Sequence, residues 1–424
     1  MTEQAQQATA SFAVPSVVSP AVHRPPSSKI RVLFVLEGLY GRGAERVTLG
    51  LISRLDRQHF EPSIWILRSE DALKSELPPG VPVTVALGPG QRIRHAVTQV
   101  PTTLLAAARG ADVIVGAVEL MPTYFAGLAS LLTRTPALAW VRNDLSHTFS
   151  EQPAWHRVLS RLIYTRLPRL VFVSQGTRET LARLQPLRSE RLSVVYNPID
   201  LERVRAYKDH PLPDWAAFMR TRPTVLGLGR LTAQKGFDTL IRAHAHLLRQ
   251  GVAHDLVIAG EGEERSALER LIEELGVQDS VHLPGYLPNP YPLLGHASVF
   301  ALSSRYEGLG GVIVEAMACG TPVVATDCPS GPGELLEGGW NGLLVPVDDA
   351  IALAGALGRM LTQPAVRHHF TVLGLRRAEA FAPAQSVPQW EAVLRDVARG
   401  GVSGGIAKTV GDNSEFVPRT LSQQ

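Results

Sequence analysis

Residues 30–55 read IRVLFVLEGLYGRGAERVTLGLISRL and carry three successive local patterns. The apolar run at 30–36 predicts a buried strand, the glycines at 38–43 predict a turn, and apolar residues at helical spacing over 44–55 predict a helix. The same alternation returns after further apolar runs, at 63–67, 112–116, 137–141, 170–174 and 192–196. Strands that are apolar on both faces and alternate with helices form a parallel sheet covered on both sides. The first half of the chain is therefore predicted to be a Rossmann-like lobe.

A second lobe of the same kind is predicted after the Pro- and Asp-punctuated connector at 197–215. Its strand runs lie at 223–229, 255–260, 281–285, 298–303 and 322–326. The fold class is therefore α/β, with two Rossmann-like lobes whose parallel sheets face each other across a cleft. The expected divisions are a disordered leader (1–29), a first lobe (30–200), a second lobe (201–382), a terminal amphipathic helix (383–399) and a disordered tail (400–424).

Composition narrows the class of protein. A chain of 424 residues with 45% hydrophobic residues suits two domains. The two cysteines, Cys319 and Cys328, lack the spacing of a metal site or a disulfide framework, which favours a reducing, cytoplasmic compartment. The apolar window at 113–132 is interrupted by Glu119 and Pro122, so no membrane span is predicted there. No pattern indicates nucleic-acid binding.

Arginines are concentrated between Glu151 and Arg191. Eight arginines lie in this stretch, against three glutamates. A basic face attracts an anionic membrane or a phosphorylated lipid. A solvated helix face would have the same composition, so the sequence leaves two alternatives: contact with the inner face of a membrane, or no partner.

The carboxyl ends of parallel strands are where ligands bind in such lobes, and three loops are expected to meet there. The first contains Gly41, Arg42 and Gly43, whose backbone N–H groups at a helix start could bind phosphate, although such a turn can also be purely structural. The second contains Arg230 and Lys235, which together could offset the two charges of a pyrophosphate.

The third loop is EGLGGVIVEAMACG, residues 307–320. Gly308, Gly310 and Gly311 would let backbone N–H groups approach a phosphate at a helix N-terminus. Glu307 and Glu315 cannot bind that phosphate, because like charges repel, so they are expected to face sugar and ribose hydroxyls. A cap or a salt bridge is the structural alternative for Glu315. The pattern predicts a site for a nucleotide diphosphate sugar.

The segments GRGAERV, GRLTAQKGF and RYEGLGGVIVEAMACGTPVVATDCPSGPGELLEGGWNGLLVP resemble the retaining glycosyltransferases of family 4, over about residues 30–397. The resemblance implies the GT-B fold, with an acceptor lobe followed by a nucleotide-sugar lobe and a final helix that crosses back to the acceptor lobe. It implies that Glu307 contacts the donor sugar and Glu315 the ribose. It also implies roles for several further positions: Arg230 and Lys235 hold the pyrophosphate, Gly41 to Gly43 face it, and Gly285 and Tyr286 border the base.

The sequence departs from that family at two places. Leu309 stands where many members have Phe, a change that keeps the position apolar. Where members often carry a histidine near the anomeric centre, this chain reads WVRNDLSH, so Arg142 or Asn143 is expected to line the acceptor side, with His147 as a weaker candidate.

The predicted activity is transfer of a hexosyl-type sugar, with retention, from a nucleotide diphosphate sugar, most simply a UDP-sugar, to a hydroxyl of a lipid-linked or polysaccharide-precursor acceptor. No D-x-D pair is present, so neither a metal nor a cofactor is expected. Alternatives are a transferase with a soluble sugar or sugar-phosphate acceptor, an inactive scaffold of the same fold, and an NAD-dependent oxidoreductase or epimerase, which the absence of GxGxxG disfavours. The identities of sugar, nucleotide and acceptor, and the oligomeric state, do not follow from the sequence.

Overall fold

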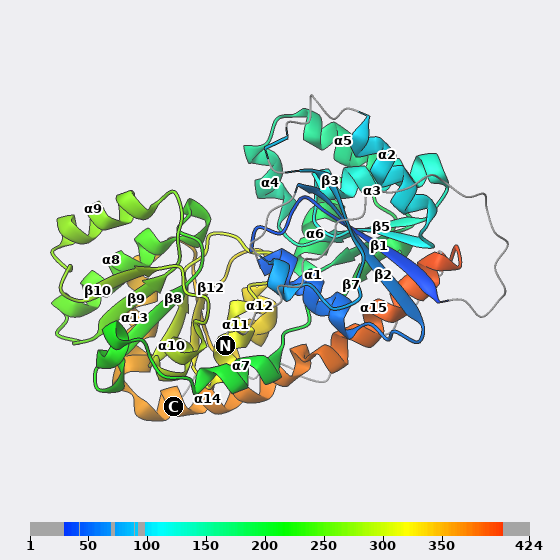
Figure 1. Cartoon of the computed structure of the whole chain (residues 1–424). Helices are drawn as coiled ribbons and strands as arrows, with labels where there is room; N and C mark the ends of the chain where they lie inside the picture. Colours follow the sequence, from blue (N-terminus) through cyan, green and yellow to red (C-terminus); the bar gives the residue numbers. More distant parts are fainter. Residues whose placement is uncertain (1–28, 42, 69–72, 89, 92–97, 402–424) are drawn as a thin grey trace, which may run out of the picture.

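The computed structural model describes residues 29–41, 43–68, 73–88, 90–91 and 98–401. The chain forms two lobes, each built around one sheet (Figure 1). The order of the first sheet is β3-β2-β1-β4-β5-β6-β7, and that of the second is β10-β9-β8-β11-β12-β13. Every strand pair is parallel. The prediction of two Rossmann-like parallel sheets is confirmed.

The strands are short and mostly buried. Those of lobe one are β1 (Ile30–Leu36), β2 (Phe60–Arg68), β3 (Val83–Leu87), β4 (Val113–Gly116), β5 (Ala137–Val141), β6 (Arg169–Phe172) and β7 (Leu192–Val194). Those of lobe two are β8 (Thr224–Leu228), β9 (Asp255–Ala259), β10 (Val281–Gly285), β11 (Val299–Leu302), β12 (Val323–Thr326) and β13 (Leu343–Val345).

The sequence analysis did not predict two of the strands, β3 and β13. Both lie at a sheet edge and both are only partly buried along their length. Thr84 interrupts the apolar run of β3, and β13 has only three residues, so neither strand gives a long apolar run in the sequence.

Helices cover both faces of each sheet. They are α1 (Gly43–Arg54), α2 (Gln99–Arg109), α3 (Met121–Thr133), α4 (Leu145–Glu151), α5 (Trp155–Tyr164), α6 (Gln175–Leu184), α7 (Leu201–Lys208), α8 (Phe237–Arg249), α9 (Arg265–Leu275), α10 (Tyr291–His296), α11 (Val312–Cys319), α12 (Pro332–Leu335), α13 (Ala350–Thr362), α14 (Pro364–Ala378) and α15 (Pro383–Ala398). Short 3-10 turns are η1 (Lys74–Glu76), η3 (Ser189–Arg191), η4 (Asp214–Arg220), η5 (Ala233–Lys235), η6 (Glu337–Gly339) and η7 (Glu379–Phe381).

Alternate residues of β1 show the layering. Val32, Phe34 and Leu36 belong to the apolar core that includes residues of α1 and α15, whereas Leu33 and Val35 belong to the core beneath α2 and α3. Successive side chains of a strand point to opposite faces, so an unbroken apolar run is what a sheet covered on both faces requires.

The last helix, α15, follows lobe two in the sequence but packs on lobe one, against α1, β1 and β4. Figure 1 shows α14 and α15 running along one side of both lobes. The predicted apolar stripe is buried in this contact, and the Trp390 ring lies 4.2 Å from that of Trp140 in β5. Helix α15 is thereby part of the core of lobe one.

The strand orders indicate where the candidate site lies. Each order reverses at one point, between β1 and β4 in lobe one and between β8 and β11 in lobe two. Ligands of open parallel sheets bind beyond the carboxyl ends of the strands at such a point. The loops after β8 and β11 contain Lys235 and Glu307, and the loops after β1 and β4 contain Gly41 and Glu119.

Candidate active site

Lys235 and Glu307 form a close ion pair in lobe two. Lys235 Nζ lies 2.5 Å from Glu307 Oε1, and the Ser304 hydroxyl donates to the same oxygen at 2.6 Å. Both charged side chains are largely buried, with exposed fractions of 17% and 8%. The structure thus joins two residues to which the sequence analysis gave separate ligands, the pyrophosphate for Lys235 and the sugar for Glu307.

Gly236 makes this proximity possible. It begins α8 with φ of +59°, and a Cβ there would lie 2.2 Å from the carbonyl oxygen of Ser303. No other residue fits such a contact at a positive φ without strain. The loop after β8 is therefore held tightly against the end of β11, which brings Lys235 to Glu307.

Arg230 lies in the same loop, but its side chain is exposed and makes no hydrogen bond or ion pair with any residue that the structure describes. Its charge acts on the neighbouring Tyr306, where it opposes the rise of the phenol pKa. Arg230 therefore has no ionic partner among the described residues, whereas the nearby Lys235 is paired with Glu307.

The glycine loop 308–311 lies in close contact with lobe one. A Cβ on Gly308 would lie 1.7 Å from the carbonyl oxygen of Arg142, at the end of β5, and the Ser174 hydroxyl of lobe one donates to the Gly308 carbonyl at 2.7 Å. Leu309 is buried, and Gly310 has φ of +79°. Gly311 is the N-cap residue of α11. The loop after β11 of lobe two therefore meets the loop after β5 of lobe one.

Glu315 lies in the first turn of α11 and is half-buried. Burial raises the pKa of its carboxyl group to about 7, while the charges of Arg203 and Arg46 and a hydrogen bond from Tyr291 act in the opposite direction. A carboxylate that is poorly solvated and close to two cations is well suited to accept hydrogen bonds from neutral hydroxyl groups.

Gly285 ends β10, and Tyr286 follows it. Gly285 has φ of +88°, and a Cβ there would lie 2.6 Å from Glu261 Oε1. Tyr286 is 54% exposed, and its hydroxyl accepts a hydrogen bond of 3.0 Å from Arg46 of lobe one. The sequence analysis did not single out Arg46, although it stands in the quoted segment GRGAERV.

In lobe one, the glycine turn after β1 is described at Gly41 and Gly43, while Arg42 lies outside the described residues. Gly41 has φ of +86°, and Gly43 is the first residue of α1. A Cβ on Gly43 would meet no atom within 4 Å. Close approach to protein atoms therefore does not require a glycine at position 43.

Arg142 differs from the expectation that it lines an acceptor site. Its side chain is buried in lobe one, donating to the Ala44 carbonyl at 2.8 Å and to the Thr48 hydroxyl at 2.9 Å, with its guanidinium 3.4 Å from the centre of the Trp140 ring. Burial lowers the pKa of this guanidinium, and Glu119 and Glu45 oppose that shift. The guanidinium thus ties the segment after β5 to α1.

Asn143 is exposed beside Arg142, and its side-chain amide donates to Glu119, which also accepts from the Arg142 backbone N–H at 3.1 Å. Glu119 follows β4 at the reversal of strand order and was not predicted as a site residue. A carboxylate that holds an exposed amide in place can orient that amide towards a ligand.

His147 is half-buried, and its ring stacks on Tyr306 of lobe two, with centroids 4.3 Å apart and planes 3° apart. The Tyr306 hydroxyl donates to Glu151 at 3.0 Å. His147 therefore contacts the residue that precedes Glu307, and its ring face is occupied by a protein partner.

Glu334 is a second interlobe residue without a predicted role. Its carboxylate accepts from the backbone N–H groups of Gln175 and Gly176, at 2.8 and 2.7 Å, and from the Tyr196 hydroxyl at 3.0 Å. These N–H groups begin α6 of lobe one, so Glu334 caps a helix of the opposite lobe.

Within the described part of the chain, no group of three or more His, Cys, Asp or Glu side chains lies close enough together to hold a metal ion. In the same part of the chain, no helix combines the length and the apolar character needed to span a membrane.

Two parallel-sheet lobes that meet at the carboxyl ends of their strands, with a carboxylate, a lysine and a glycine loop at the junction, define the architecture of a GT-B glycosyltransferase. Family models agree, matching "Glycosyltransferase Family 4" over residues 41–203 and "Glycosyl transferases group 1" over residues 216–372. The chain belongs to the glycosyltransferases built from these two domains.

Curated relatives come from the same class. A Campylobacter jejuni N-acetylgalactosamine-N,N'-diacetylbacillosaminyl-diphospho-undecaprenol 4-alpha-N-acetylgalactosaminyltransferase is 32% identical over 249 residues, 58% of this chain and 64% of the relative. The lipopolysaccharide core biosynthesis glycosyltransferase LpsE of Rhizobium meliloti is 40% identical over 168 residues, 38% of this chain and 48% of the relative. The chain thus spans less than two thirds of the length of each.

Among solved structures, Anabaena Alr3699/HepE in complex with UDP-glucose has a TM-score of 0.74 at 21% identity, covering 87% of this chain and all of that one. The sucrose-phosphate synthase of Thermosynechococcus elongatus has a TM-score of 0.70 at 19% identity, covering 88% of this chain and all of that one. At these identities the likeness shows the shared fold.

Proposed function

We propose that the protein transfers a sugar from a UDP-sugar to a hydroxyl group of a lipid-linked or polysaccharide-precursor acceptor, with retention at the anomeric carbon. The observation that carries the proposal is the Lys235–Glu307 pair at the foot of the glycine loop. This pair sets a cation for the diphosphate directly beside a carboxylate for the sugar.

The leaving diphosphate gains negative charge in the transition state, and fixed cations and N–H groups stabilise that charge. In the proposal, Arg230 and Lys235 supply the cations and the N-terminus of α11 supplies the N–H groups, so the reaction is assigned no metal and no cofactor. Glu315 accepts hydrogen bonds from the ribose, and Gly285 and Tyr286 border the base. The departing phosphate takes the acceptor proton on the same face of the sugar, as the family resemblance implies for retention.

Support for UDP comes from the HepE structures, whose titles describe complexes with UDP and with UDP-glucose. Support for a lipid-linked or surface-glycan acceptor comes from the names of the Campylobacter and Rhizobium relatives. On the acceptor side, the exposed Asn143 amide held by Glu119 is the group that we assign to an acceptor hydroxyl.

The donor is tested by measuring the thermal stability of the full chain against UDP-, GDP- and ADP-sugars. A UDP-sugar at 100 times its dissociation constant should stabilise the protein by about 2.7 kcal/mol. Stabilisation by a GDP- or ADP-sugar alone would refute the UDP assignment, and stabilisation by none would refute the donor site.

The acceptor and the stereochemistry are tested with the donor that stabilises best. Transfer to a diphosphate-lipid-linked glycan is compared with transfer to soluble sugars and sugar phosphates, and the proton NMR couplings of the product give its anomeric configuration. Preferential transfer to soluble acceptors, or inversion, would contradict the corresponding part of the proposal.

A further inference from the structure

Exposed apolar side chains gather on two adjacent helices of lobe one. Of the 13 large apolar side chains that are exposed among the described residues, six lie on α3 and α5. We call this set the α3–α5 face; its members are Leu128, Leu131, Leu132, Trp155, Val158 and Leu162. An apolar patch of this kind on a protein surface marks a docking site.

The two helices that carry this face touch each other. A Cβ on Gly127 of α3 would lie 2.6 Å from Ile163 Cγ2 of α5, so the helix backbones approach closely. Along α5, the buried residues His156, Ser160 and Tyr164 form one side. Trp155, Val158 and Leu162, at spacings of three and four, form the other. Helix α5 is therefore buried in lobe one along one side and exposes an apolar stripe along the other.

Positive charge borders this stripe. Arg161, Arg166 and Arg188 are exposed, and none of their side chains forms an ion pair with a residue that the structure describes. Other arginines of the 151–191 cluster are committed: Arg169 is buried and paired with Asp396, and Arg183 lies 3.4 Å from Glu179. The basic surface therefore includes only some of the arginines at 151–191, and it lies beside the α3–α5 face.

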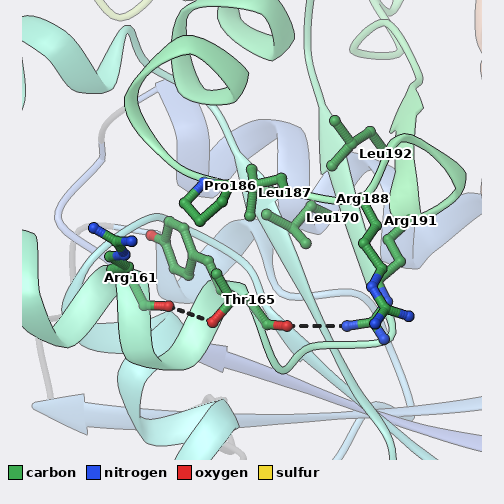
Figure 2. Close-up of a pocket in the computed structure, with 9 residues that line it drawn as sticks. Arg161, Thr165, Leu170, Pro186, Leu187, Arg188, Arg191 and Leu192 are labelled. Carbon is green, nitrogen blue, oxygen red and sulfur yellow. Dashed lines mark hydrogen bonds between the residues drawn. The ribbon is translucent and has the colours of Figure 1, made fainter.

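A cavity of about 330 Å³ opens next to the same arginines (Figure 2). Arg161 lines one side of it and Arg188 and Arg191 the other. Arg191 donates to the Thr165 carbonyl at 3.0 Å, but its buried Nε has no hydrogen-bond partner among the described residues. Arginine side chains around a cavity with an unsatisfied donor are suited to a phosphate group.

We propose that the α3–α5 face docks on an anionic lipid bilayer. Trp155, Val158 and Leu162 enter the boundary between headgroups and acyl chains, and Arg161, Arg166 and Arg188 contact lipid phosphates. Apolar and aromatic side chains flanked by arginines are characteristic of helices that lie in the plane of a membrane interface. Arginines alone would suit any polyanion, whereas the apolar stripe between them favours a surface with an apolar interior.

The inference rests on the proposed function, because a lipid-linked acceptor is presented at a membrane surface. Helix α4 connects the two places: its N-cap residue Asp144 adjoins Asn143, and α5 begins four residues after its end. Docking through α5 would therefore bring the proposed acceptor side next to the bilayer.

The test is co-sedimentation of the full chain with vesicles of phosphatidylcholine alone or mixed with phosphatidylglycerol, at low and high salt. The wild type should bind the mixed vesicles and bind them more weakly at high salt. V158S/L162S should lose at least about tenfold in binding. R161Q/R188Q should lose on the order of fivefold for each arginine, only with anionic vesicles.

Matched controls lie on lobe two. Ile351 is 70% exposed, like Val158 at 71%, so I351S should bind as the wild type does. Arg242 and Arg270 are exposed on α8 and α9, so R242Q/R270Q should also bind normally.

Equal binding by V158S/L162S and the wild type, or no binding by the wild type, would overturn the proposal. A wild-type dimer that V158S/L162S dissociates, without vesicle binding, would assign the face to a second copy of the chain and overturn it as well. UDP-sugar stabilisation is measured on every variant. Absence of vesicle binding by the wild type, with its UDP-sugar stabilisation intact, refutes docking alone, whereas absence of stabilisation in the wild type refutes the donor assignment alone.

Discussion

The two lobes share one architecture but use the carboxyl ends of their strands differently. In lobe two, the loops after β8 and β11 hold the candidate donor residues Arg230, Lys235 and Glu307 within two short segments. In lobe one, the polar side chains that follow β4 and β5 contact other parts of the same lobe: Arg142 is bonded to the start of α1 and Glu119 to Asn143.

This contrast follows from what each lobe is proposed to bind. A diphosphate and a ribose are the same in every donor of one type, so compact loops of fixed residue types suffice for them. An acceptor is recognised by the shape of a surface assembled from distant segments, and lobe one offers only Asn143 and the half-buried His147 from its predicted set. The donor side can therefore be recognised from a sequence motif, whereas the acceptor side cannot.

The largest expected effect tests whether α15 belongs to lobe one. Trp390→Ala removes a fully buried ring that lies against Trp140, and such truncations cost about 3–5 kcal/mol. Calorimetry should show a lower transition temperature for lobe one, while the transition that a UDP-sugar shifts stays in place. Trp215→Ala, which removes a 40% exposed ring from lobe two, serves as the control. An equal loss in both variants would contradict the assignment of α15 to the core of lobe one.

The next effect concerns the donor side. Lys235→Ala should lower kcat/KM by about 100- to 1,000-fold, or roughly 3 to 4 kcal/mol, because it removes a cation from the developing diphosphate charge. The same change leaves the buried Glu307 unpaired, so thermal stability is measured in parallel.

A double-mutant cycle separates the two roles of Lys235. In the Glu307→Gln background the ion pair is already absent, and Lys235→Ala should still reduce turnover if the lysine acts on the phosphate. Unchanged turnover in that background would show that Lys235 serves only to balance the charge of Glu307.

The interlobe contact between Gly308 and the Arg142 carbonyl gives the third prediction. Gly308→Ala places a methyl group against the Arg142 carbonyl, so the lobes must separate there, and a displacement of about 1 Å can cost on the order of 100-fold in rate. Turnover is compared with that of Gly355→Ala in α13, whose methyl group would meet no atom within 4 Å. Full activity of Gly308→Ala would mean that this contact opens during the reaction.

Apolar patterning was sufficient for the central strands of both sheets. Runs such as 30–36 and 137–141 are buried on both faces, and burial of that kind leaves a continuous signal in the sequence. The edge strands β3 and β13 give a weaker signal, because Thr84 interrupts the apolar run of β3 and β13 has only three residues.

The site was predictable only where its parts are local. Lys235 and Glu307 stand in recognisable loops, but their contact joins residues 72 positions apart, and the contact of Arg46 with Tyr286 spans 240 positions. Nothing near Arg46 in the sequence indicates that partner. The burial of Arg142 could not be predicted from the sequence for the same reason, since it depends on Ala44 and Thr48 in another element.

The last prediction tests the ribose carboxylate of lobe two by its protonation. Because the pKa of Glu315 is raised from an ordinary value of 4.5 to about 7, the folded protein holds this proton more tightly than the unfolded chain, and the stability cost of ionisation appears as pH rises from about 4.5 to 7. Glu315→Gln should therefore remove that decline in the free energy of unfolding, which is measured by denaturant titration at several pH values.

Donor binding should show the opposite trend, because only the ionised carboxylate accepts both ribose hydroxyl groups. Below pH 7 the ionised fraction falls about tenfold per pH unit, so the dissociation constant of a UDP-sugar should rise towards that slope in the wild type. The diester phosphates of a UDP-sugar do not titrate in this range, so isothermal titration calorimetry from pH 5 to 8 isolates the contribution of Glu315. A dissociation constant that does not change with pH in Glu315→Gln would support the assignment of the ribose to lobe two. An equally steep profile in that variant would place the titrating group elsewhere and contradict the assignment of the ribose to Glu315.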